Sequence, residues 1–197
     1  MTIKKNGMEF SDDDVIRSVK RGNTANFEVL VNRYKSRIVN FVYRMIGDYD
    51  ESQNIAQEVF FQIYRKIGKY KENSTFQSFI YTIARNITLN YLKKMNRVTF
   101  FSRLSEKGEG EYIPAGDVTP AEKMQKEERE KIVTRGLENL IINQRLALIL
   151  KIYLRFSYKK IADVTGWSQP KIETLISRGK VNLKNYVRLQ EKGGKDV

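Results

Sequence analysis

Three neighbouring aspartates in the stretch SDDD, Ser11–Asp14, are the first residues of the chain whose spacing suggests chemistry, because a carboxylate cluster can bind magnesium. The same stretch also suits the start of a helix, where serine is a favoured cap and acidic side chains interact well with the helix dipole. That second interpretation requires no metal. Two-metal phosphodiester chemistry needs convergent carboxylates, and the other acids of this half lie at a turn and along a helix without a ligand pattern: Asp48, Asp50, Glu51 and Glu58. We therefore expect no metal site and no nuclease.

The chain contains neither cysteine nor histidine. Disulfides, thiolate zinc sites and most catalytic triads are thereby excluded, as are the usual ligands of transition metals. A recombinase or another enzyme acting on nucleic acid is disfavoured further, since no serine stands in a convincing activating context. We expect a protein that has no cofactor and is not an enzyme.

Side chains suited to binding a nucleic-acid strand occur in STFQSFIYTIARNITLNYLKKMNR, Ser74–Arg97. Amides and cations recur there at helical spacing, and these groups can hydrogen-bond bases or neutralise phosphates: Asn86, Asn90, Lys93 and Arg97. A second stripe is apolar and predicts packing on a core: Phe76, Phe79, Ile80, Ile83, Ala84 and Ile87. The stretch therefore predicts a helix with a core side and a candidate nucleic-acid side.

A polar loop precedes this helix in GKYKENST, Gly68–Thr75. Tyr70, Asn73 and Ser74 could hold an unstacked base between an aromatic ring and hydrogen-bonding partners. Taken alone, the composition is also that of an ordinary surface loop.

Another amphipathic helix is predicted in GDYDESQNIAQEVFFQIYRKI, Gly47–Ile67. Its apolar residues recur every four positions: Ile55, Val59, Ile63 and Ile67. Polar residues occupy the other faces: Asn54, Gln57, Glu58, Gln62 and Arg65. The residues leave two interpretations open, a solvated surface or a face that docks on another protein.

The C-terminal part has the pattern of two helices joined by a glycine turn, in SYKKIADVTGWSQPKIETLISRGKVNLKNYV, Ser157–Val187. Ser157 and Ser168 are candidate helix caps, Gly166 permits a left-handed turn, and Pro170 suits a first helical turn. Ile172, Ile176 and Leu183 are expected inside, and Gly179 is expected to allow close helix approach. This arrangement is a helix-turn-helix.

The outer faces of its second helix carry the candidate DNA contacts: Lys171, Glu173, Thr174, Ser177, Arg178, Lys180 and Lys184. A recognition helix presents its N-terminal side chains to the major groove, where arginine reads guanine, glutamate accepts from cytosine, and lysine binds phosphate. A helical hairpin with a solvated face is the alternative interpretation.

Charge and periodicity define the organisation. The net charge of +13 and the pI near 9.8 favour a polyanionic partner, either nucleic acid or an anionic membrane face. Basic residues exceed acidic ones in 1–96 and 132–197, whereas the two are nearly balanced between these blocks. No apolar run could span a bilayer and no secretory signal begins the chain, so a cytoplasmic protein is expected.

Helical periodicity dominates both basic blocks, and glycines, prolines and acids break it in SEKGEGEYIPAGDVTPAEK. The predicted fold class is all-α, with two small helical domains joined by a flexible linker and a helix-turn-helix in the second. The predicted boundaries are 1–97 for the first domain, 98–131 for the linker and charged helix start, 132–190 for the second domain, and 191–197 for a tail.

The order of these features resembles the bacterial extracytoplasmic-function (ECF) sigma factors. The stretches FEVLVNRYKSRIVNFVYRMIGDYDESQNIAQEVFFQIYRKI and FQSFIYTIARNITLNYLKK are similar to the start and end of that family's first conserved domain. The stretch SYKKIADVTGWSQPKIETLISRGKVNLK is similar to the helix-turn-helix of its second domain. Phe79 stands where the family commonly has tryptophan, and Glu173 and Leu175 stand where basic residues are frequent.

The resemblance implies a role for each set of residues. Docking on core RNA polymerase is implied for Asn54, Gln57, Glu58, Gln62 and Arg65. Recognition and melting of the minus-ten promoter element is implied for Tyr70, Asn73, Ser74, Asn86, Asn90, Lys93, Lys94 and Arg97. The second helix of the C-terminal motif is implied to read the minus-thirty-five element, and polymerase itself performs nucleotidyl transfer.

Further partners follow from the resemblance. The linker is expected to pass through polymerase channels toward the RNA exit, and an anti-sigma factor is expected to mask both domains. A stand-alone helix-turn-helix regulator remains the alternative function. It would bind duplex promoter DNA without polymerase.

Overall fold

The computed structural model describes residues 4–5, 8–71, 75–101 and 131–193 of the 197-residue chain. Nearly all of the described structure is helical. A short antiparallel pair joins β1 (Lys4–Lys5) to β2 (Met8–Glu9), with Lys4 opposite Glu9. The predicted all-helical class is confirmed, since these strands have two residues each.

The chain forms two compact units, residues 1–42 with 51–104 and residues 43–50 with 105–197. The predicted linker, 98–131, falls mostly outside the described residues. Its first residues continue a helix, α4, which ends at Phe101. The predicted tail also begins inside a helix, because α8 continues to Gly193.

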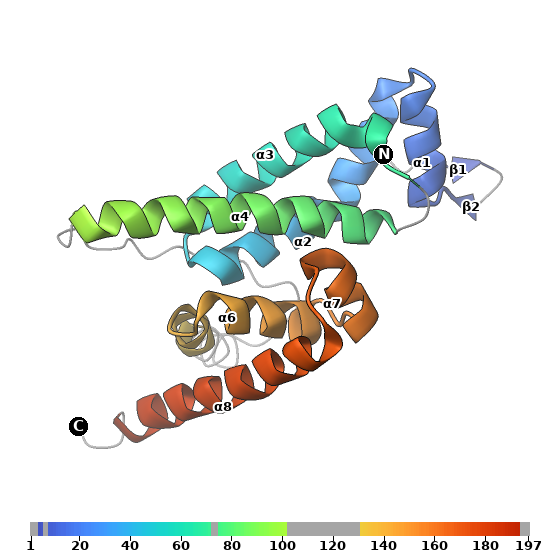
Figure 1. The fold of residues 1–197 in the computed structure, drawn as a ribbon. Helices are drawn as coiled ribbons and strands as arrows, with labels where there is room; N and C mark the ends of the chain where they lie inside the picture. The colour runs from blue at the N-terminus through green and yellow to red at the C-terminus, as the bar shows by residue number, and fades with distance from the viewer. Residues whose placement is uncertain (1–3, 6–7, 72–74, 102–130, 194–197) are drawn as a thin grey trace, which may run out of the picture. The chain divides into compact units, whose positions relative to one another are not determined.

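The first unit is built from helices (Figure 1) whose bounds are α1 (Asp12–Lys20), η1 (Thr24–Asn26), α2 (Phe27–Ile46), α3 (Tyr49–Lys66), η2 (Ile67–Lys69) and α4 (Phe76–Phe101). Apolar side chains at helical spacing form its core. They include Leu30, Ile38, Val59, Ile63 and Ile80, none of which is exposed. Each buried side chain of this size contributes about 1.5–3 kcal/mol to folding.

The SDDD stretch begins α1, as the helix-start interpretation predicts. Asp14 donates its backbone N–H to Ser11 Oγ at 3.2 Å, and Ser11 returns its own N–H to Asp14 Oδ2 at 3.2 Å. This capping box satisfies two backbone donors at once. The hydrogen bond from the Ser11 side chain, together with the Arg17 guanidinium at 2.8 Å, lowers the pKa of Asp14 to about 2.

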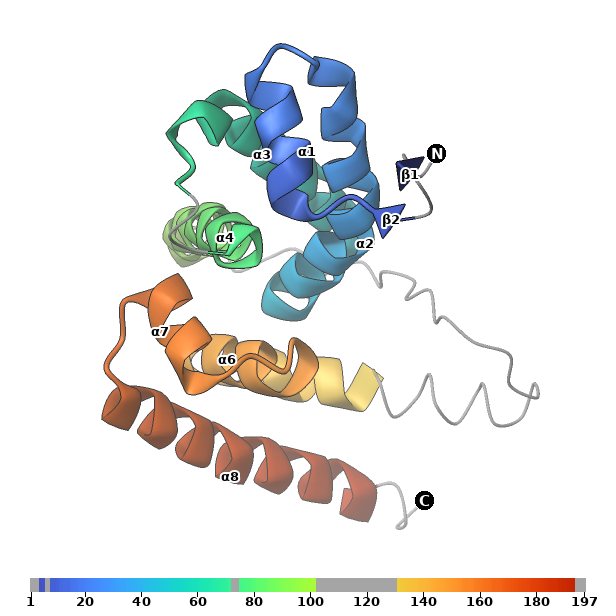
Figure 2. The ribbon, with the colours of Figure 1, turned by 90° about the vertical axis from the view of Figure 1, so that its right-hand side faces the viewer.

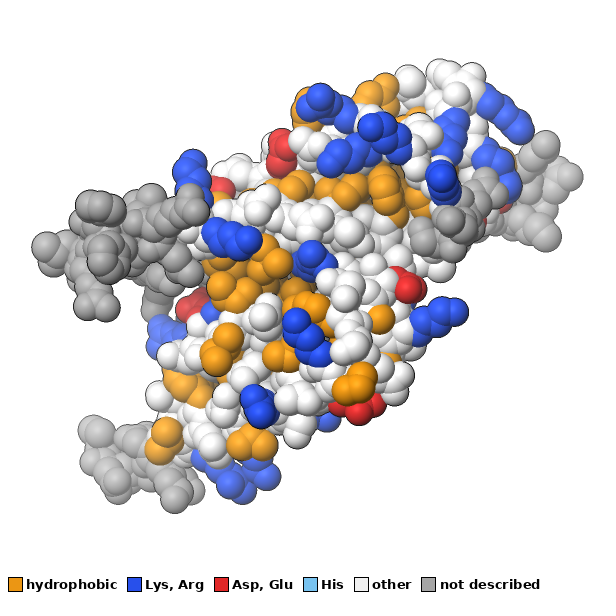
Figure 3. Space-filling model, in the orientation of Figure 1, with side chains coloured by type: hydrophobic (Ala, Val, Ile, Leu, Met, Phe, Trp, Pro, Cys, Tyr) orange, Lys and Arg blue, Asp and Glu red, His pale blue; other side chains and the backbone are white. Residues whose placement is uncertain are grey.

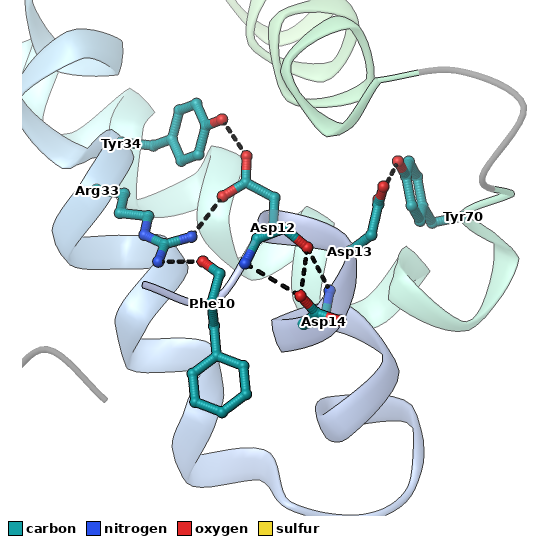
Figure 4. Close-up of polar contacts among 8 residues, drawn as sticks. Phe10, Asp12, Asp13, Asp14, Arg33, Tyr34 and Tyr70 are labelled. Atoms are coloured by element: carbon teal, nitrogen blue, oxygen red, sulfur yellow. Dashed lines mark hydrogen bonds and ion pairs between the residues drawn. The ribbon is translucent and has the colours of Figure 1, made fainter. Parts of the chain in front are cut away.

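The other two aspartates bind different partners (Figure 4). Asp12 accepts from Tyr34 and from Arg33 of α2, the latter at 2.9 Å. Burial, assisted by this carboxylate, raises the pKa of Tyr34. Asp13 accepts from Tyr70, just beyond η2, at 2.9 Å. Asp12 and Asp13 therefore join α1 to its neighbours, whereas Asp14 caps α1 itself, and the three carboxylates have separate partners.

The second unit contains helical residues 131–138, then α6 (Ile142–Leu148), the π-helical turn η3 (Ile149–Tyr153), α7 (Tyr158–Thr165) and α8 (Gln169–Gly193). α6 lies alongside α8 in both ribbon views (Figures 1 and 2). Gly179 makes this approach possible, because a Cβ there would lie 3.1 Å from Leu148. Asn182 also donates to Gln144 across the pair at 3.0 Å.

Among the described helices, none has both the length and the apolar content needed to cross a membrane.

Candidate nucleic-acid and protein interfaces

α3 has the two-sided character that its sequence predicts. Ile55, Val59 and Ile63 of α3 are buried, and so is Ile67 at the start of η2. The predicted polar face is accessible, with Asn54, Gln57, Glu58 and Arg65 exposed and Gln62 partly exposed. This face presents both hydrogen-bonding groups and charges to a partner.

Amides hold the carboxylates of this face in place. Asn54 donates to Glu51 at 3.1 Å, and Gln62 donates to Glu58 at 2.7 Å. Each hydrogen bond favours one orientation of the carboxylate that accepts it. The result is a partly pre-ordered acidic surface on α3.

Two exposed aromatic residues adjoin the polar face. Phe61 is 55% exposed and Tyr64 is 44% exposed, and the Arg65 guanidinium lies 5.6 Å from the Phe61 ring. Large exposed rings beside charges are typical of protein contact surfaces. Sequence reasoning missed both residues because they fall outside the four-residue apolar stripe.

A groove of about 630 Å³ separates α3 from α4, and its walls unite two sets of residues that were predicted separately. Three come from the predicted polymerase face on α3: Asn54, Glu58 and Gln62. Three come from the predicted strand-binding stripe on α4: Asn86, Asn90 and Lys94. The remaining lining residues are Glu51, Ile55, Lys66, Ile83, Ile87 and Tyr91. We call this feature the α3–α4 groove.

The α4 wall has an apolar base and a polar edge. Ile83 is buried, whereas Asn86, Asn90 and Lys94 are exposed. Lys93 is exposed on the same helix but does not line the groove. Arg97 belongs to the same helix, but its side chain lies outside the described part. Asn73 and Ser74 also lie outside the described residues.

Tyr70 corrects one sequence-based expectation. Only 3% of this residue is exposed, and its ring packs against Phe76 and Phe79 with centroids 6.0 and 5.4 Å away. Its hydroxyl donates to Asp13, and its carbonyl accepts from Lys20 at 2.7 Å. A ring enclosed in this way offers no face on which a base can stack, so Tyr70 is a buried anchor and not a stacking platform.

The second unit forms the predicted helix-turn-helix. Ser157 caps α7 by accepting from the N–H of Lys160 at 3.2 Å, and Gly166 ends the helix with a φ of +72°. Ser168 precedes α8, and its carbonyl accepts from Ile172 at 3.1 Å. Ile172 and Ile176 are buried as predicted, and Leu183 is partly buried.

Every predicted DNA-contact residue of α8 is exposed: Lys171, Glu173, Thr174, Ser177, Arg178, Lys180 and Lys184. Four of these side chains are cationic and one is acidic. On the face shown in Figure 3, lysine and arginine are spread over both units, and acidic side chains are fewer. Such a surface suits phosphate groups.

Local contacts order the start of α8. Gln169 donates to Glu173 at 3.0 Å, and Thr174 donates to the carbonyl of Pro170 at 2.9 Å. The Lys171 ammonium lies 5.3 Å from the ring of Trp167 in the turn. The sequence analysis did not single out Gln169 or Trp167. The position of Gln169 at a helix start and that of Trp167 in the turn could have identified them.

The described residues contain no group of three acids that could hold a metal ion. The interfaces described above instead consist of hydrogen-bonding, cationic and aromatic groups. Such surfaces can bind polyanions and other proteins.

Two family models match the chain. Sigma-70 region 2 matches residues 30–98, which include α3 and most of α4. Sigma-70, region 4 matches residues 130–183, which include the helix-turn-helix. Together the two matches cover more than half of the sequence.

Curated relatives are similar over most of their length. RNA polymerase sigma-H factor of Pseudomonas aeruginosa is 30% identical over 157 residues, covering 78% of this chain and 81% of the relative. ECF RNA polymerase sigma factor SigW of Bacillus subtilis is 27% identical over 185 residues, covering 92% and 99%. ECF RNA polymerase sigma-E factor of Escherichia coli is 27% identical over 185 residues, covering 91% and 96%.

Solved structures share the fold. CnrH, in complex with the cytosolic domain of CnrY, superposes with a TM-score of 0.66 at 16% identity and covers 90% of this chain and 97% of its own. The sigma factor RpoE of Bartonella quintana, in complex with the anti-sigma factor NepR, gives 0.67 at 19% identity and covers 83% and 97%.

Proposed function

The chain belongs to the ECF type of RNA polymerase sigma factors, and we propose how its two units divide promoter recognition. It directs RNA polymerase to promoters and is not an enzyme. Family membership favours a promoter-recognition subunit over a stand-alone helix-turn-helix regulator. A stand-alone regulator would lack the first unit, and the Sigma-70 region 2 match accounts for that unit.

The exposed face of α3 is the surface that we assign to core polymerase. The assigned residues are Asn54, Gln57, Glu58, Gln62 and Arg65. The assignment is supported by the pre-ordered carboxylates of Glu51 and Glu58 and by the exposed rings of Phe61 and Tyr64. Aromatic anchors within a charged surround are common in protein interfaces.

α4 is assigned to the melted minus-ten strand, through Asn86, Asn90, Lys93, Lys94 and Arg97. Asn73 and Ser74, in the segment before α4, are assigned to a base that leaves the stack. Unstacking a base costs a few kcal/mol, which hydrogen bonds and phosphate contacts on a single strand can offset. The exposed amides and lysines of α4 are chemically suited to both tasks.

α8 is assigned to the duplex minus-thirty-five element. Arg178 and Glu173 are the candidates for base edges, and Gln169 joins them because its amide can read adenine. Lys180 and Lys184 suit phosphates. The exposure of all these side chains at or beyond the Gly166 turn supports the assignment.

An anti-sigma factor is the proposed inhibitor, by analogy with the complexes of CnrH with CnrY and of RpoE with NepR. We place the protein in the cytoplasm, where polymerase and promoters are found.

The α3–α4 groove is the observation that carries the proposal most directly. Residues assigned to polymerase and residues assigned to the melted strand line one depression. A subunit that delivers polymerase to an opening promoter needs these two surfaces to adjoin.

In vitro transcription from a pooled genomic library tests the function. Sigma-free core polymerase from the source organism is used with and without this protein, and RNA 5′ ends are sequenced. New start sites that share motifs about ten and thirty-five base pairs upstream are expected, the spacing at which the two units would contact DNA. If core polymerase gains no start sites while the protein alone shifts duplex DNA, the proposed function is wrong.

A further inference from the structure

Trp167 lies in the turn of the helix-turn-helix, just before α8 begins. Its backbone N–H donates to the Thr165 hydroxyl at 3.2 Å, and that hydroxyl donates to the carbonyl of Ile161 at 2.6 Å. Thr165 and Ile161 both belong to α7, and both are buried. The backbone of Trp167 is therefore fixed to the end of α7.

The Trp167 ring contacts a cation in the first turn of α8. The Lys171 ammonium lies 5.3 Å from the ring centroid, within the range of a cation–π interaction. Lys171 is exposed, and Trp167 is partly exposed. A lysine side chain has several rotatable bonds, and contact with a fixed ring restricts where its ammonium lies.

Lys171 keeps a positive charge that can attract a partner. Within the part of the chain that the structure describes, no carboxylate forms an ion pair with this ammonium. An aromatic ring holds a cation without neutralising its charge. The ammonium therefore combines a restricted position with a full charge, which suits it to contact a phosphate group.

Neighbouring side chains at the start of α8 are assigned to base edges. Gln169 donates to Glu173 at 3.0 Å, and both residues are exposed. Such side chains read bases only when the helix lies at one register along the duplex, and phosphate contacts fix that register. A cation held within the same turns of α8 is placed to make such a contact.

We propose that Trp167 is a positioning residue for recognition of the minus-thirty-five element, because its ring holds the Lys171 ammonium where that ammonium contacts a DNA phosphate. The inference rests on the proposed function of α8. It gives Trp167 a role in which the ring itself does not touch DNA. It also assigns Lys171 to the duplex backbone and not to a base edge.

Two other roles for Trp167 compete with this one. In the first, the ring touches DNA directly, and in the second it only stabilises the turn. In both, replacing Trp167 weakens DNA binding whether or not Lys171 is present. If the ring acts through Lys171, its replacement has no further effect once Lys171 has been removed. A double-mutant cycle therefore separates the roles.

The first measurement tests the contact itself. Trp167 is the only tryptophan in the chain, so tryptophan fluorescence of the full-length protein reports on its surroundings. Lys171→Met removes the charge but keeps an unbranched side chain, and it is expected to change the intensity or the wavelength of the emission. Lys159→Met, at an exposed lysine of α7, is the matched control and should leave the emission unchanged. Equal spectra for the wild type and both variants would overturn the inference.

The second measurement is the affinity of complete holoenzyme for a short duplex that carries the minus-thirty-five element found by transcription mapping. Fluorescence anisotropy is recorded at several salt concentrations for Trp167→Ala, Lys171→Met and the double variant. Trp167→Phe keeps an aromatic ring and serves as the conservative rescue. A duplex in which the element is scrambled is measured in parallel, and thermal unfolding of each variant detects any loss of structure.

Lys171→Met is expected to lower the salt dependence of binding by about 0.9, the effect of losing one phosphate contact. Trp167→Ala is expected to lower the affinity about threefold, the effect of losing one exposed cation–π interaction, and Trp167→Phe should restore most of it. In the Lys171→Met protein, Trp167→Ala should have no further effect.

Three results would overturn the inference alone. These are an unchanged affinity in Trp167→Ala, an equal loss from Trp167→Ala with and without Lys171, and an unchanged salt dependence in Lys171→Met. If the wild-type holoenzyme binds the intact and scrambled duplexes equally, the assignment of α8 fails and this inference fails with it.

Discussion

α4 and α8 have similar lengths and residue types, but their polar side chains lie in different surroundings. They have 26 and 25 residues, and each buries an apolar stripe while exposing lysines along another face. α4 forms one wall of a groove opposite the acidic surface of α3. α8 instead begins directly after the Gly166 turn, with the polar side chains of its first turns exposed.

The difference shows that composition alone does not distinguish a strand-binding helix from a duplex-reading helix. A major groove accepts a helix whose N-terminal side chains protrude. A single strand is better held along a surface that supplies amides for bases and cations for phosphates. The α4 wall and the start of α8 match these two requirements respectively.

Reversing two charges on α4 should have the largest effect. Lys93→Glu with Lys94→Glu is expected to reduce open-complex formation roughly a hundredfold and to lower the salt dependence of single-strand binding by about 0.7 per lost phosphate contact. Polymerase binding should be preserved. Permanganate footprinting and anisotropy at several salt concentrations provide the measurements.

Arg21→Glu with Lys35→Glu is the matched control, because both cations are exposed on the same unit and neither lines the groove. An equal loss in this control would mean that net charge, and not the α4 surface, is responsible.

Changing the α3 face should produce the opposite pattern. Gln57→Ala with Glu58→Lys is expected to weaken binding to core polymerase about tenfold, since charged interface residues act mainly on partner affinity. Binding of the protein to single-stranded DNA should not weaken. Polymerase affinity is measured by competition with a labelled wild-type protein.

Glu28→Lys provides the control for charge reversal at an exposed acid of the same unit. A Gln57 and Glu58 variant that binds polymerase normally would remove α3 from the docking surface.

Arg178→Ala on α8 is expected to lower the rate of transcription about fivefold. The loss should occur only on promoters that retain the minus-thirty-five element. The preference for one base over the other three should weaken at a single base pair of that element. Arg188→Ala is the matched control, because this exposed arginine follows Arg178 on the same helix by about 15 Å. Transcription from a panel of single-base promoter variants measures both effects. Similar losses in the two variants would point to nonspecific attraction.

Substitutions at two left-handed residues of the second unit, Arg155 and Gly166, should have opposite effects on stability. Arg155 has a φ of +53°, a left-handed conformation that costs a non-glycine residue about 1 kcal/mol. Arg155→Gly is therefore expected to raise the free energy of unfolding by about 0.5 kcal/mol, because the strain that it relieves exceeds the conformational entropy that it adds to the unfolded chain. Gly166→Ala should lower it by about 1 kcal/mol. Urea unfolding measures the stability of both variants. If Arg155→Gly lowers stability, the Arg155 side chain makes contacts that outweigh the backbone strain.

The smallest effect concerns pH and is confined to the first unit. The pKa of Asp14 is lowered to about 2, so its ionised form is favoured by folding. Its contribution is complete above the ordinary pKa of 3.8 and is lost as pH falls through about 2. Between pH 4 and 2, the unfolding temperature of Asp14→Asn should therefore fall less steeply than that of the wild type. Parallel curves would show that Asp14 does not stabilise the fold.

Features set by short-range rules could be predicted from the sequence. The Ser157 cap, the left-handed Gly166 and the buried Ile172 follow from local patterns and are confirmed. The buried stripe of α3 follows from its four-residue spacing. Each of these features depends on residues within a few positions of one another.

Features that depend on distant partners could not be predicted. Tyr70 was expected to stack on a base, but its environment is set by Asp13, 57 positions earlier. The α3–α4 groove likewise exists only after two helices have packed. An exposed lysine and a groove-lining lysine, such as Lys93 and Lys94, look the same in the sequence.

Site-specific photocrosslinking in the open complex tests the central claim most directly. A photoreactive amino acid is placed at Asn90 on α4 or at Ser177 on α8, and the crosslinked nucleotides are mapped. The account predicts that position 90 crosslinks to the non-template strand at the minus-ten element only after melting. Position 177 should crosslink to the duplex minus-thirty-five element before and after melting. Crosslinks from position 90 to closed duplex, or from position 177 to the melted strand, would contradict the division between α4 and α8.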